Sequence, residues 1–278
     1  MSEDSAGPEK KALRSRDGVR PMEVLVFDVG MNVGMDTAYY LSKGCRVIAV
    51  EANPVLCEEA RHRFAHALRS GQLVIENVGV ADDAGTATFY VNERNSEFSA
   101  FDLPVASRGG AYHAIQVPTV RFRDLLAKHG VPHYLKIDIE GYDGRCLEAL
   151  EPGRLPKYVS IEAHELHYLL KLWCLGYRKF KVIDQMRHNS TLPLFSNENP
   201  LSRALKLACW YLDRVKNKWG KGLRYPSPSS GPFGEDTPGD WRSLEDVAYD
   251  WLHLRREHRR RGTLNHRSWF DFHAKRND

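Results

Sequence analysis

Two acidic side chains, Asp28 and Glu51, end two apolar segments that are separated by a glycine-containing turn and a helical pattern. The turn runs from Gly30 to Gly34, and glycine allows the backbone to turn sharply and to approach a ligand closely. Glu51 follows Asp28 by 23 residues, close to the roughly 20-residue interval at which an acid meets ribose hydroxyls in nucleotide-binding folds. This strand, turn, helix and strand pattern predicts a nucleotide pocket.

The turn does not follow the dinucleotide fingerprint G-x-G-x-x-G, because Met31 and Asn32 come directly after Gly30. The carboxylate of Asp28 would repel a phosphate but would attract an ammonium group. S-adenosylmethionine carries an ammonium, a carboxylate, a ribose and a sulfonium but no phosphate, so it fits this turn better than a dinucleotide. The alternative is a tight turn with one capping aspartate that binds no ligand.

Five short motifs in a fixed order extend this interpretation. They are DVGMNVGMDT (28–37), VEANP (50–54), NVGVADDAG (77–85), YLKIDIEGYD (134–143) and SIEAH (160–164). Together they resemble the FkbM family of S-adenosylmethionine-dependent methyltransferases, and the resemblance covers roughly residues 22–184. Met31 departs from the alanine usual in the family, and the Phe122-Arg123 region departs from its leucine–aspartate pair.

The resemblance implies a Rossmann-like class I methyltransferase fold and O-methylation of a hydroxyl on a sugar, a glycan or another small molecule. Ten residues are expected to bind the cofactor: Asp28, Gly30, Asn32, Gly34, Thr37, Glu51, Asn53, Asn77, Val78 and Asp138. Asn53 has an alternative role, because an asparagine before Pro54 is a favourable cap for the next helix.

Three residues are candidates for removing the acceptor proton: His164, Asp138 and Glu140. An unperturbed histidine has a pKa of about 6.5, so His164 could accept a proton near neutral pH; its alternative is a structural hydrogen bond. Asp138 and Glu140 alternate along a predicted strand and should point to opposite faces. With Glu162 they offer the hard oxygens that Mg²⁺ prefers, but their spacing forms no known metal loop, so metal dependence is left open.

These residues require a sheet to position them. Strands are predicted at 24–27, 46–50, 73–77, 134–138, 157–163 and 177–183, with helices between most of them. Such alternation predicts a mostly parallel sheet with helices on both faces, and the site residues fall at the strands' carboxyl ends, where such sheets bind ligands. The polar segment 92–114 is a candidate lid, since long loops in compact domains are often functional.

Composition sets the remaining limits. The 278 residues are 42% hydrophobic and carry a net charge of +4, enough for a sizeable core in one large or two small domains. Five cysteines without a C-x-x-C spacing argue against a disulfide framework. No segment resembles a signal peptide or a membrane span, so a cytoplasmic protein is expected.

The predicted organisation is a disordered lead over 1–21, a cofactor-binding domain over 22–190, and a basic, tryptophan-rich, mainly helical extension over 191–278. A basic amphipathic helix over Arg203–Trp219 could contact a membrane or pack on the main domain, and another helix is predicted over Leu244–Arg261. Nucleic acid is not an expected partner, because no RNA-binding module is recognisable. Two other functions compete with O-methylation of a small molecule. One is a nucleic-acid methyltransferase, and the other is an inactive, cofactor-binding scaffold that docks on membranes.

Overall fold

The computed structural model describes residues 24–185, 189–190, 230–260 and 269–277. The predicted lead over 1–21 and the predicted helix Arg203–Trp219 lie outside the described residues. None of the described helices is both long enough and apolar enough to cross a membrane.

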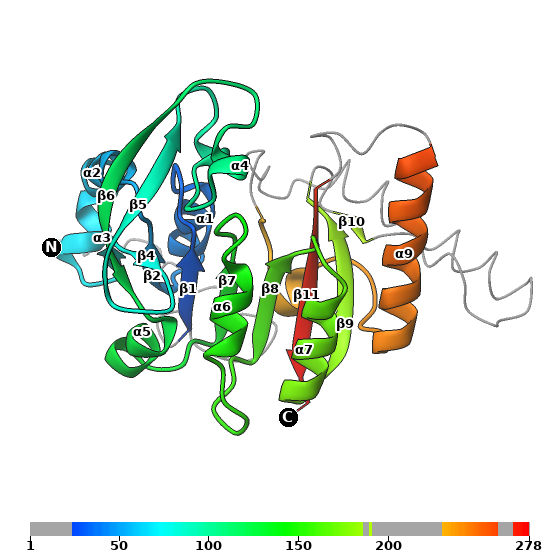
Figure 1. Cartoon of the computed structure of the whole chain (residues 1–278). Helices are drawn as coiled ribbons and strands as arrows, with labels where there is room; N and C mark the ends of the chain where they lie inside the picture. The colour runs from blue at the N-terminus through cyan, green and yellow to red at the C-terminus, as the bar shows by residue number, and fades with distance from the viewer. Residues whose placement is uncertain (1–23, 186–188, 191–229, 261–268, 278) are drawn as a thin grey trace, which may run out of the picture.

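An eight-stranded sheet forms the centre of the protein, with the strand order β10-β9-β11-β8-β7-β1-β2-β3 (Figure 1). Its strands are β1 (Leu25–Val29), β2 (Arg46–Val50), β3 (Leu73–Glu76), β7 (Tyr134–Ile137), β8 (Tyr158–Glu162), β9 (Tyr177–Asp184), β10 (Asn189–Ser190) and β11 (Phe270–Arg276). The run from β3 to β8 is parallel throughout. The strand order reverses between β1 and β7, which creates a topological switch point above their carboxyl ends.

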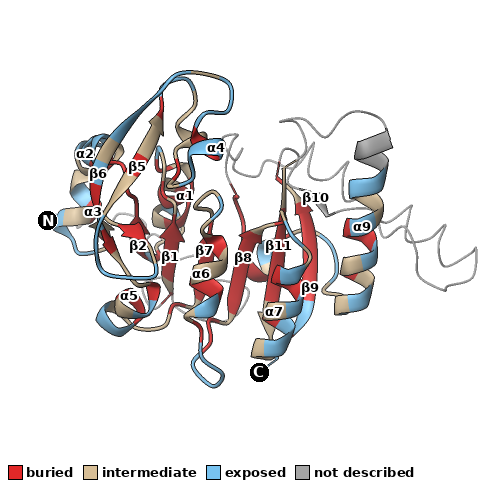
Figure 2. Cartoon of the chain, viewed as in Figure 1, coloured by how far each residue is buried: buried red, intermediate tan, exposed pale blue. Residues whose placement is uncertain are grey.

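Helices cover both faces of this sheet. They are α1 (Met35–Ser42), α2 (Pro54–Arg63), α3 (Ala65–Arg69), α5 (Phe122–His129), α6 (Asp143–Glu148), α7 (His167–Leu175) and α9 (Leu244–Arg260). One core packs α5, α6, α7 and α9 against the face that carries Phe27 and Val29. The other packs α1, α2 and α3 against the face that carries Val26. Figure 2 shows the strands between these layers as the most buried part of the protein, and the predicted doubly wound α/β fold is confirmed.

The alternation along β1 explains this two-sided core. Successive side chains of a strand point to opposite faces, so Val26 and Phe27, both fully buried, enter different cores. Helix α2 begins as its sequence predicts, because the Asn53 side chain accepts a hydrogen bond from Val55 N and Pro54 follows it.

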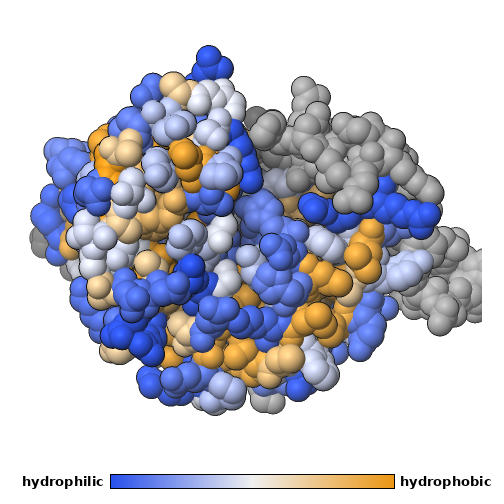
Figure 3. Space-filling model, in the orientation of Figure 1, coloured by the Kyte–Doolittle hydropathy of each residue, from blue (hydrophilic) through white to orange (hydrophobic). Residues whose placement is uncertain are grey.

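On the outer layer, Leu170 of α7 is exposed, and apolar surface gathers over this helix (Figure 3).

A small three-stranded sheet stands beside the main one. It contains β4 (Gly79–Val80), β5 (Gly85–Asn92) and β6 (Tyr112–Val120), in the order β4-β6-β5. The segment between β5 and β6, predicted as a lid, contains the one-turn helices η2 (Ser96–Phe98) and α4 (Leu103–Ala106). Phe89 and Phe101 pack edge to face at 5.1 Å and hold this segment against the small sheet.

The strand β11 is the main difference from the predicted organisation. The helix expected over 244–261 is present as α9, but the extension also supplies β11, which lies between β8 and β9 and is antiparallel to both. The sequence FDFHAKR alternates apolar with polar residues, a pattern typical of a strand, but no strand was predicted there. Residues from the predicted extension therefore complete the sheet of the predicted cofactor-binding domain.

Candidate active site

A cavity of about 760 Å³ opens above the carboxyl ends of β1, β2, β7 and β8. The small sheet and η2 close one side of it, and α9 and the start of β11 close the other. This is the position at which open α/β sheets bind ligands. Five of the ten predicted cofactor residues line it directly: Gly30, Asn32, Glu51, Val78 and Asp138. The other two candidate bases, Glu140 and His164, line it as well.

The turn after β1 is shaped by glycine. Gly30 has φ +85°, and a Cβ atom there would lie 1.7 Å from the carbonyl oxygen of Asp138. The backbone nitrogens of Gly30 and Met31 both donate to the carbonyl of Val50, at 3.0 Å each. The turn is thereby fastened to the end of β2 on one side and to the end of β7 on the other.

Glu51 is fixed by its carboxylate. One oxygen accepts a hydrogen bond from Asn32 N and the other from Asn53 N, both at 2.8 Å. The Asn77 side chain donates to the carbonyls of Glu51 and Ala52, at 2.9 and 3.1 Å. These contacts hold the Glu51 side chain, which is largely buried, at the cavity wall with lone pairs left for a ligand.

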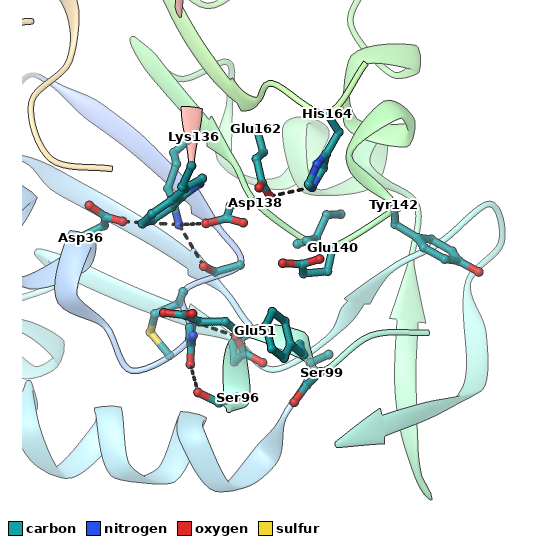
Figure 4. A pocket seen from close by; sticks show the side chains of 18 of the residues that line it. Asp36, Glu51, Ser96, Ser99, Lys136, Asp138, Glu140, Tyr142, Glu162 and His164 are labelled. Carbon is teal, nitrogen blue, oxygen red and sulfur yellow. Dashed lines mark hydrogen bonds and ion pairs between the residues drawn. The ribbon is translucent and has the colours of Figure 1, made fainter. Parts of the chain in front are cut away.

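Lys136 is the centre of a buried ion network at the cavity floor (Figure 4). Its ammonium lies 3.2 Å from an Asp28 oxygen and 3.5 Å from oxygens of Asp36 and Asp138, and it donates to the Gly30 carbonyl at 3.0 Å. Burial lowers the pKa of Lys136, but the three carboxylate charges outweigh burial and hold this pKa well above its ordinary value. One fixed cation therefore faces three carboxylates, which leaves the network with an excess of negative charge.

Five predicted cofactor residues lie behind the wall and do not line the cavity: Asp28, Gly34, Thr37, Asn53 and Asn77. Asp28 is fully buried and accepts a 2.6 Å hydrogen bond from the Thr37 hydroxyl. Gly34, with φ +75°, is the N-cap of α1. In this structure these residues hold the turn, the helix ends and Lys136 in place.

The turn after β7 differs from the predicted alternation. The strand ends at Ile137, and Glu140 adopts a left-handed backbone with φ +43°. Asp143 holds this turn, because its carboxylate accepts hydrogen bonds from Ile139 N at 3.0 Å and Gly141 N at 3.2 Å. The prediction that Asp138 and Glu140 point to opposite faces was wrong, since both line the same cavity and are turned toward the same space in Figure 4.

Glu140, Glu162 and His164 form a cluster at the end of β8. One ligating atom of each lies within 4.8 Å of the others, and His164 Nε2 lies 2.8 Å from a Glu162 oxygen. Burial, together with the charges of Glu162 and Asp138, raises the pKa of Glu140 to about 8. Burial also raises the pKa of Asp138 to about 7, against the opposing charge of Lys136.

The electrostatics of His164 differ from those of an unperturbed imidazole. Burial lowers its pKa, but the hydrogen bond to Glu162 and the charges of Glu162 and Glu140 outweigh burial and raise this pKa to about 9. His164 is therefore protonated at neutral pH in this arrangement and is not a free base. Asp138, whose pKa of about 7 leaves it ionised in part at neutral pH, is better suited to accept a proton there. Glu140, with a pKa of about 8, is mostly protonated at that pH.

The C-terminal elements support this end of the cavity. Ala163 N donates to the Phe270 carbonyl at 2.7 Å, and Trp251 Nε1 donates to the Ala163 carbonyl at 2.8 Å. At the other end, the carboxylate of Asp36 accepts hydrogen bonds from Ser230 N and Gly231 N. The residues that flank Glu162 are thus held by α9 and β11.

Sequence reasoning missed two wall residues. Asp36 was overlooked because it lies in the first turn of a helix, where an acidic residue is unremarkable. No role was assigned to Lys136 from the sequence, although a lysine inside the apolar segment YLKI is itself a signal of a buried counter-charge. Ser96 of η2 donates to the Asn32 side chain at 2.7 Å, a contact between segments that no local pattern predicts.

Comparison with known proteins identifies the family to which this sequence is similar. The sequence matches the methyltransferase FkbM domain over residues 28–190. No protein of curated function matches the chain. Among solved structures, it is similar to methyltransferase FkbM from Methylobacillus flagellatus KT, with 16% identity, a TM-score of 0.36, and coverage of 54% of this chain and 36% of that one.

Two further structures align over most of the chain. A putative sarcosine dimethylglycine methyltransferase from Galdieria sulphuraria has 9% identity and a TM-score of 0.38, covering 92% of this chain and 79% of that one. An S-adenosylmethionine-dependent methyltransferase from Thiobacillus denitrificans, in complex with S-adenosyl-L-homocysteine, has 11% identity and a TM-score of 0.34, covering 91% and 85%. This chain spans only about a third of the length of the Methylobacillus protein.

The doubly wound sheet, with antiparallel β11 beside β8 and a cavity over the parallel strand ends, has the Rossmann-like architecture of class I methyltransferases. The domain match covers more than half of the sequence. The chain therefore belongs to the methyltransferase FkbM family.

Proposed function

We propose that the protein transfers a methyl group from S-adenosylmethionine to a hydroxyl oxygen of a sugar, a glycan or another small molecule. The observation that carries this proposal is the charge of the cavity wall. Six acidic side chains line it, against Lys136, Arg108, Arg255 and the imidazole of His164. With Glu140 mostly and Asp138 partly protonated at neutral pH, the wall has no excess of positive charge to bind a phosphate, and its ionised carboxylates can pair with an ammonium and a sulfonium group.

Each part of the cofactor has a complementary part of the wall. Glu51, fixed by two backbone N–H groups, is placed to accept hydrogen bonds from ribose hydroxyls. The network of Lys136, Asp36 and Asp138 offers both signs of charge to the amino and carboxylate groups of the methionine portion. Val78 and Phe101 belong to the part of the wall near the small sheet and suit the adenine ring.

The remaining wall, at the end of β8, suits the acceptor. In the reaction, a lone pair of the acceptor oxygen attacks the methyl carbon, and the electrons of the carbon–sulfur bond return to sulfur, which gives S-adenosylhomocysteine. The hydroxyl proton must leave, and Asp138, with a pKa of about 7, can accept it near neutral pH. Glu140, with a pKa of about 8, can accept it at higher pH. Holding the two reactants in line contributes up to ~7–11 kcal/mol in well-oriented systems.

Isothermal titration calorimetry with S-adenosylmethionine and S-adenosylhomocysteine tests the donor. The Glu51→Ala variant is expected to bind about 10–150-fold more weakly, because a hydrogen bond to a charged group contributes ~1.5–3 kcal/mol. The matched control is Glu58→Ala, whose carboxylate is exposed and pairs with Arg61 on the surface of α2, and it should bind as the unmodified protein does. An intact protein that binds neither ligand would refute the proposal.

The acceptor is tested by incubating the protein with isotope-labelled S-adenosylmethionine and a panel of hydroxyl-bearing sugars and small molecules. Transfer of label to an oxygen, identified by mass spectrometry of the product, supports O-methylation. Label on nitrogen or carbon would contradict the acceptor assignment while leaving the donor assignment intact.

A further inference from the structure

The cluster of Glu140, Glu162 and His164 combines two carboxylates and one imidazole at the edge of the cavity. One oxygen or nitrogen from each residue lies within 4.8 Å of the others, so a single ion between them can reach all three after small side-chain rotations. We propose that these three residues bind a divalent first-row metal ion, with Mn²⁺ as the representative ion.

The position of Glu140 is fixed by its backbone. Non-glycine residues rarely adopt positive φ values, yet Glu140 has φ +43°. The buried carboxylate of Asp143 maintains this turn through Ile139 N and Gly141 N. The turn directs Glu140 back toward the end of β8 instead of along the strand direction. Asp143 therefore supports the position of one proposed ligand, as residues around metal ligands commonly do.

The other two ligands come from β8 and the residues that follow it. Glu162 is the last residue of β8 and pairs in register with Asp271 of β11. The Glu162 carbonyl accepts a hydrogen bond from His164 N at 2.9 Å, which places both side chains over the same strand end. With Ala163 hydrogen-bonded to α9 and β11, this segment is anchored on both sides.

The exposure of the three side chains leaves room for further ligands. Glu140 and Glu162 are 17% and 16% exposed and His164 is 39% exposed, so the cluster is neither sealed nor free on the surface. Three protein ligands with an open position toward a cavity are typical of metal sites that bind a substrate. Carboxylates suit Mn²⁺ and imidazole suits the first-row transition metals, so this mixed set favours Mn²⁺ over Mg²⁺ or Ca²⁺.

The role of the ion rests on the proposed function. An acceptor hydroxyl bound to the ion would lose its proton more readily and would be held facing the cofactor. Glu140 would then serve as a ligand, and Asp138, which is not part of the cluster, would be left to take the proton.

The experiment titrates Mn²⁺ into the full chain after treatment with a chelator and measures free Mn²⁺ by electron paramagnetic resonance. One saturable site per chain is expected. Glu140→Gln and Glu162→Gln should each weaken binding by about tenfold or more, the scale on which metal sites respond to loss of a ligand or its support. Circular dichroism establishes that each variant is folded.

The matched control is the neighbouring pair formed by Glu165 and His167, whose atoms lie 2.7 Å apart and whose side chains are 62% and 54% exposed. It has the same residue types, and Glu165→Gln should leave Mn²⁺ binding unchanged. The site is refuted if the unmodified chain shows no saturable binding up to about 1 mM, the weak end of the range for protein sites. Equal binding by the unmodified chain and both cluster variants would refute it as well.

Calorimetry with S-adenosylmethionine in the absence of metal separates the two proposals. A chain that binds Mn²⁺ through the cluster but does not bind the methyl donor would retain the metal site and lose the proposed function. A chain that binds the donor but not Mn²⁺ would do the reverse.

Discussion

Replacing Lys136 with methionine should strongly destabilise the protein, because this change removes the only cation from a network of two buried carboxylates, Asp28 and Asp36, and a partly exposed one, Asp138. The Lys136 ammonium is 3.2 Å from Asp28 and 3.5 Å from both Asp36 and Asp138. Methionine has a similar length, so the packing of the side chain is largely kept and the effect is mainly electrostatic.

The magnitude follows from this burial. Removing one partner of a buried ion pair typically costs ~3–5 kcal/mol, because the other charge is left without compensation. Here three carboxylates lose the same partner, and the Lys136 side chain is only 3% exposed, so solvent cannot replace it. We expect a decrease in the free energy of unfolding at the upper end of that range, about 5 kcal/mol, at pH 8.

The pH dependence gives this prediction a second test. Burial already raises the folded-state pKa of Asp138 to about 7 and raises that of Asp28, and loss of the Lys136 charge should raise both further above the unfolded value of about 3.9. The folded state then binds more protons than the unfolded state, so the variant regains stability as the pH falls. The difference between the variant and the unmodified protein should therefore be smaller at pH 5.5 than at pH 8.

The assay is urea unfolding followed by circular dichroism, with Lys181→Met as the matched control. Lys181 is equally buried but donates to neutral oxygens of Thr237, at 3.0 and 3.1 Å, and burial lowers its pKa to about 8. Its replacement should cost only ~1–3 kcal/mol, for oxygens left unpaired. Equal losses in the two variants, or a Lys136→Met loss that does not change with pH, would show that the reasoning is incorrect.

Three other changes test the turn, the sheet and the site support. Gly30→Ala should abolish binding of S-adenosylmethionine in calorimetry, because its Cβ would lie 1.7 Å from the Asp138 carbonyl at φ +85°; normal binding would contradict the assigned turn. Burial, with the charge of Lys181, lowers the pKa of His273 to about 3. Its unfolded form therefore takes up a proton below about pH 6.5, and the unmodified protein should lose about 2 kcal/mol between pH 7.5 and 5 that His273→Gln does not lose; parallel urea curves would exclude this. Asp143→Asn should lower the free energy of unfolding by ~1–3 kcal/mol, because an amide has one acceptor oxygen where the carboxylate uses two, one for each backbone N–H group. Thermal unfolding of both proteins, compared at the midpoint temperature of the unmodified one, measures this loss.

The glycine turn and the parallel strands could be predicted from sequence because local residue types determine them. Glycines at positions of positive φ, apolar runs ending in acids, and the Asn53-Pro54 helix start each depend on neighbours within a few residues. These features place Gly30 and Glu51 at the cavity as predicted. The predicted residues that line the cavity lie next to a strand end, but so do Asp28, Asn53 and Asn77, which do not line it.

The features of the site that the sequence does not predict have a different origin, because they depend on contacts between distant segments. Asp36 lines the cavity and Asp28 does not. Both carboxylates lie beside Lys136, which is about a hundred residues further along the chain. The basicity of His164 depends on Glu140 and Glu162 lying within reach of it. Tertiary contacts determine these properties, and no periodicity in the sequence records them.

The place of β11 has a consequence for synthesis of the chain. β8 and β9 are made long before β11, which joins them across more than eighty residues, and until then their edges offer unpaired backbone groups to other chains. A contact this far apart in sequence is slow to form. The emerging polypeptide should therefore need protection from aggregation until β11 has been made.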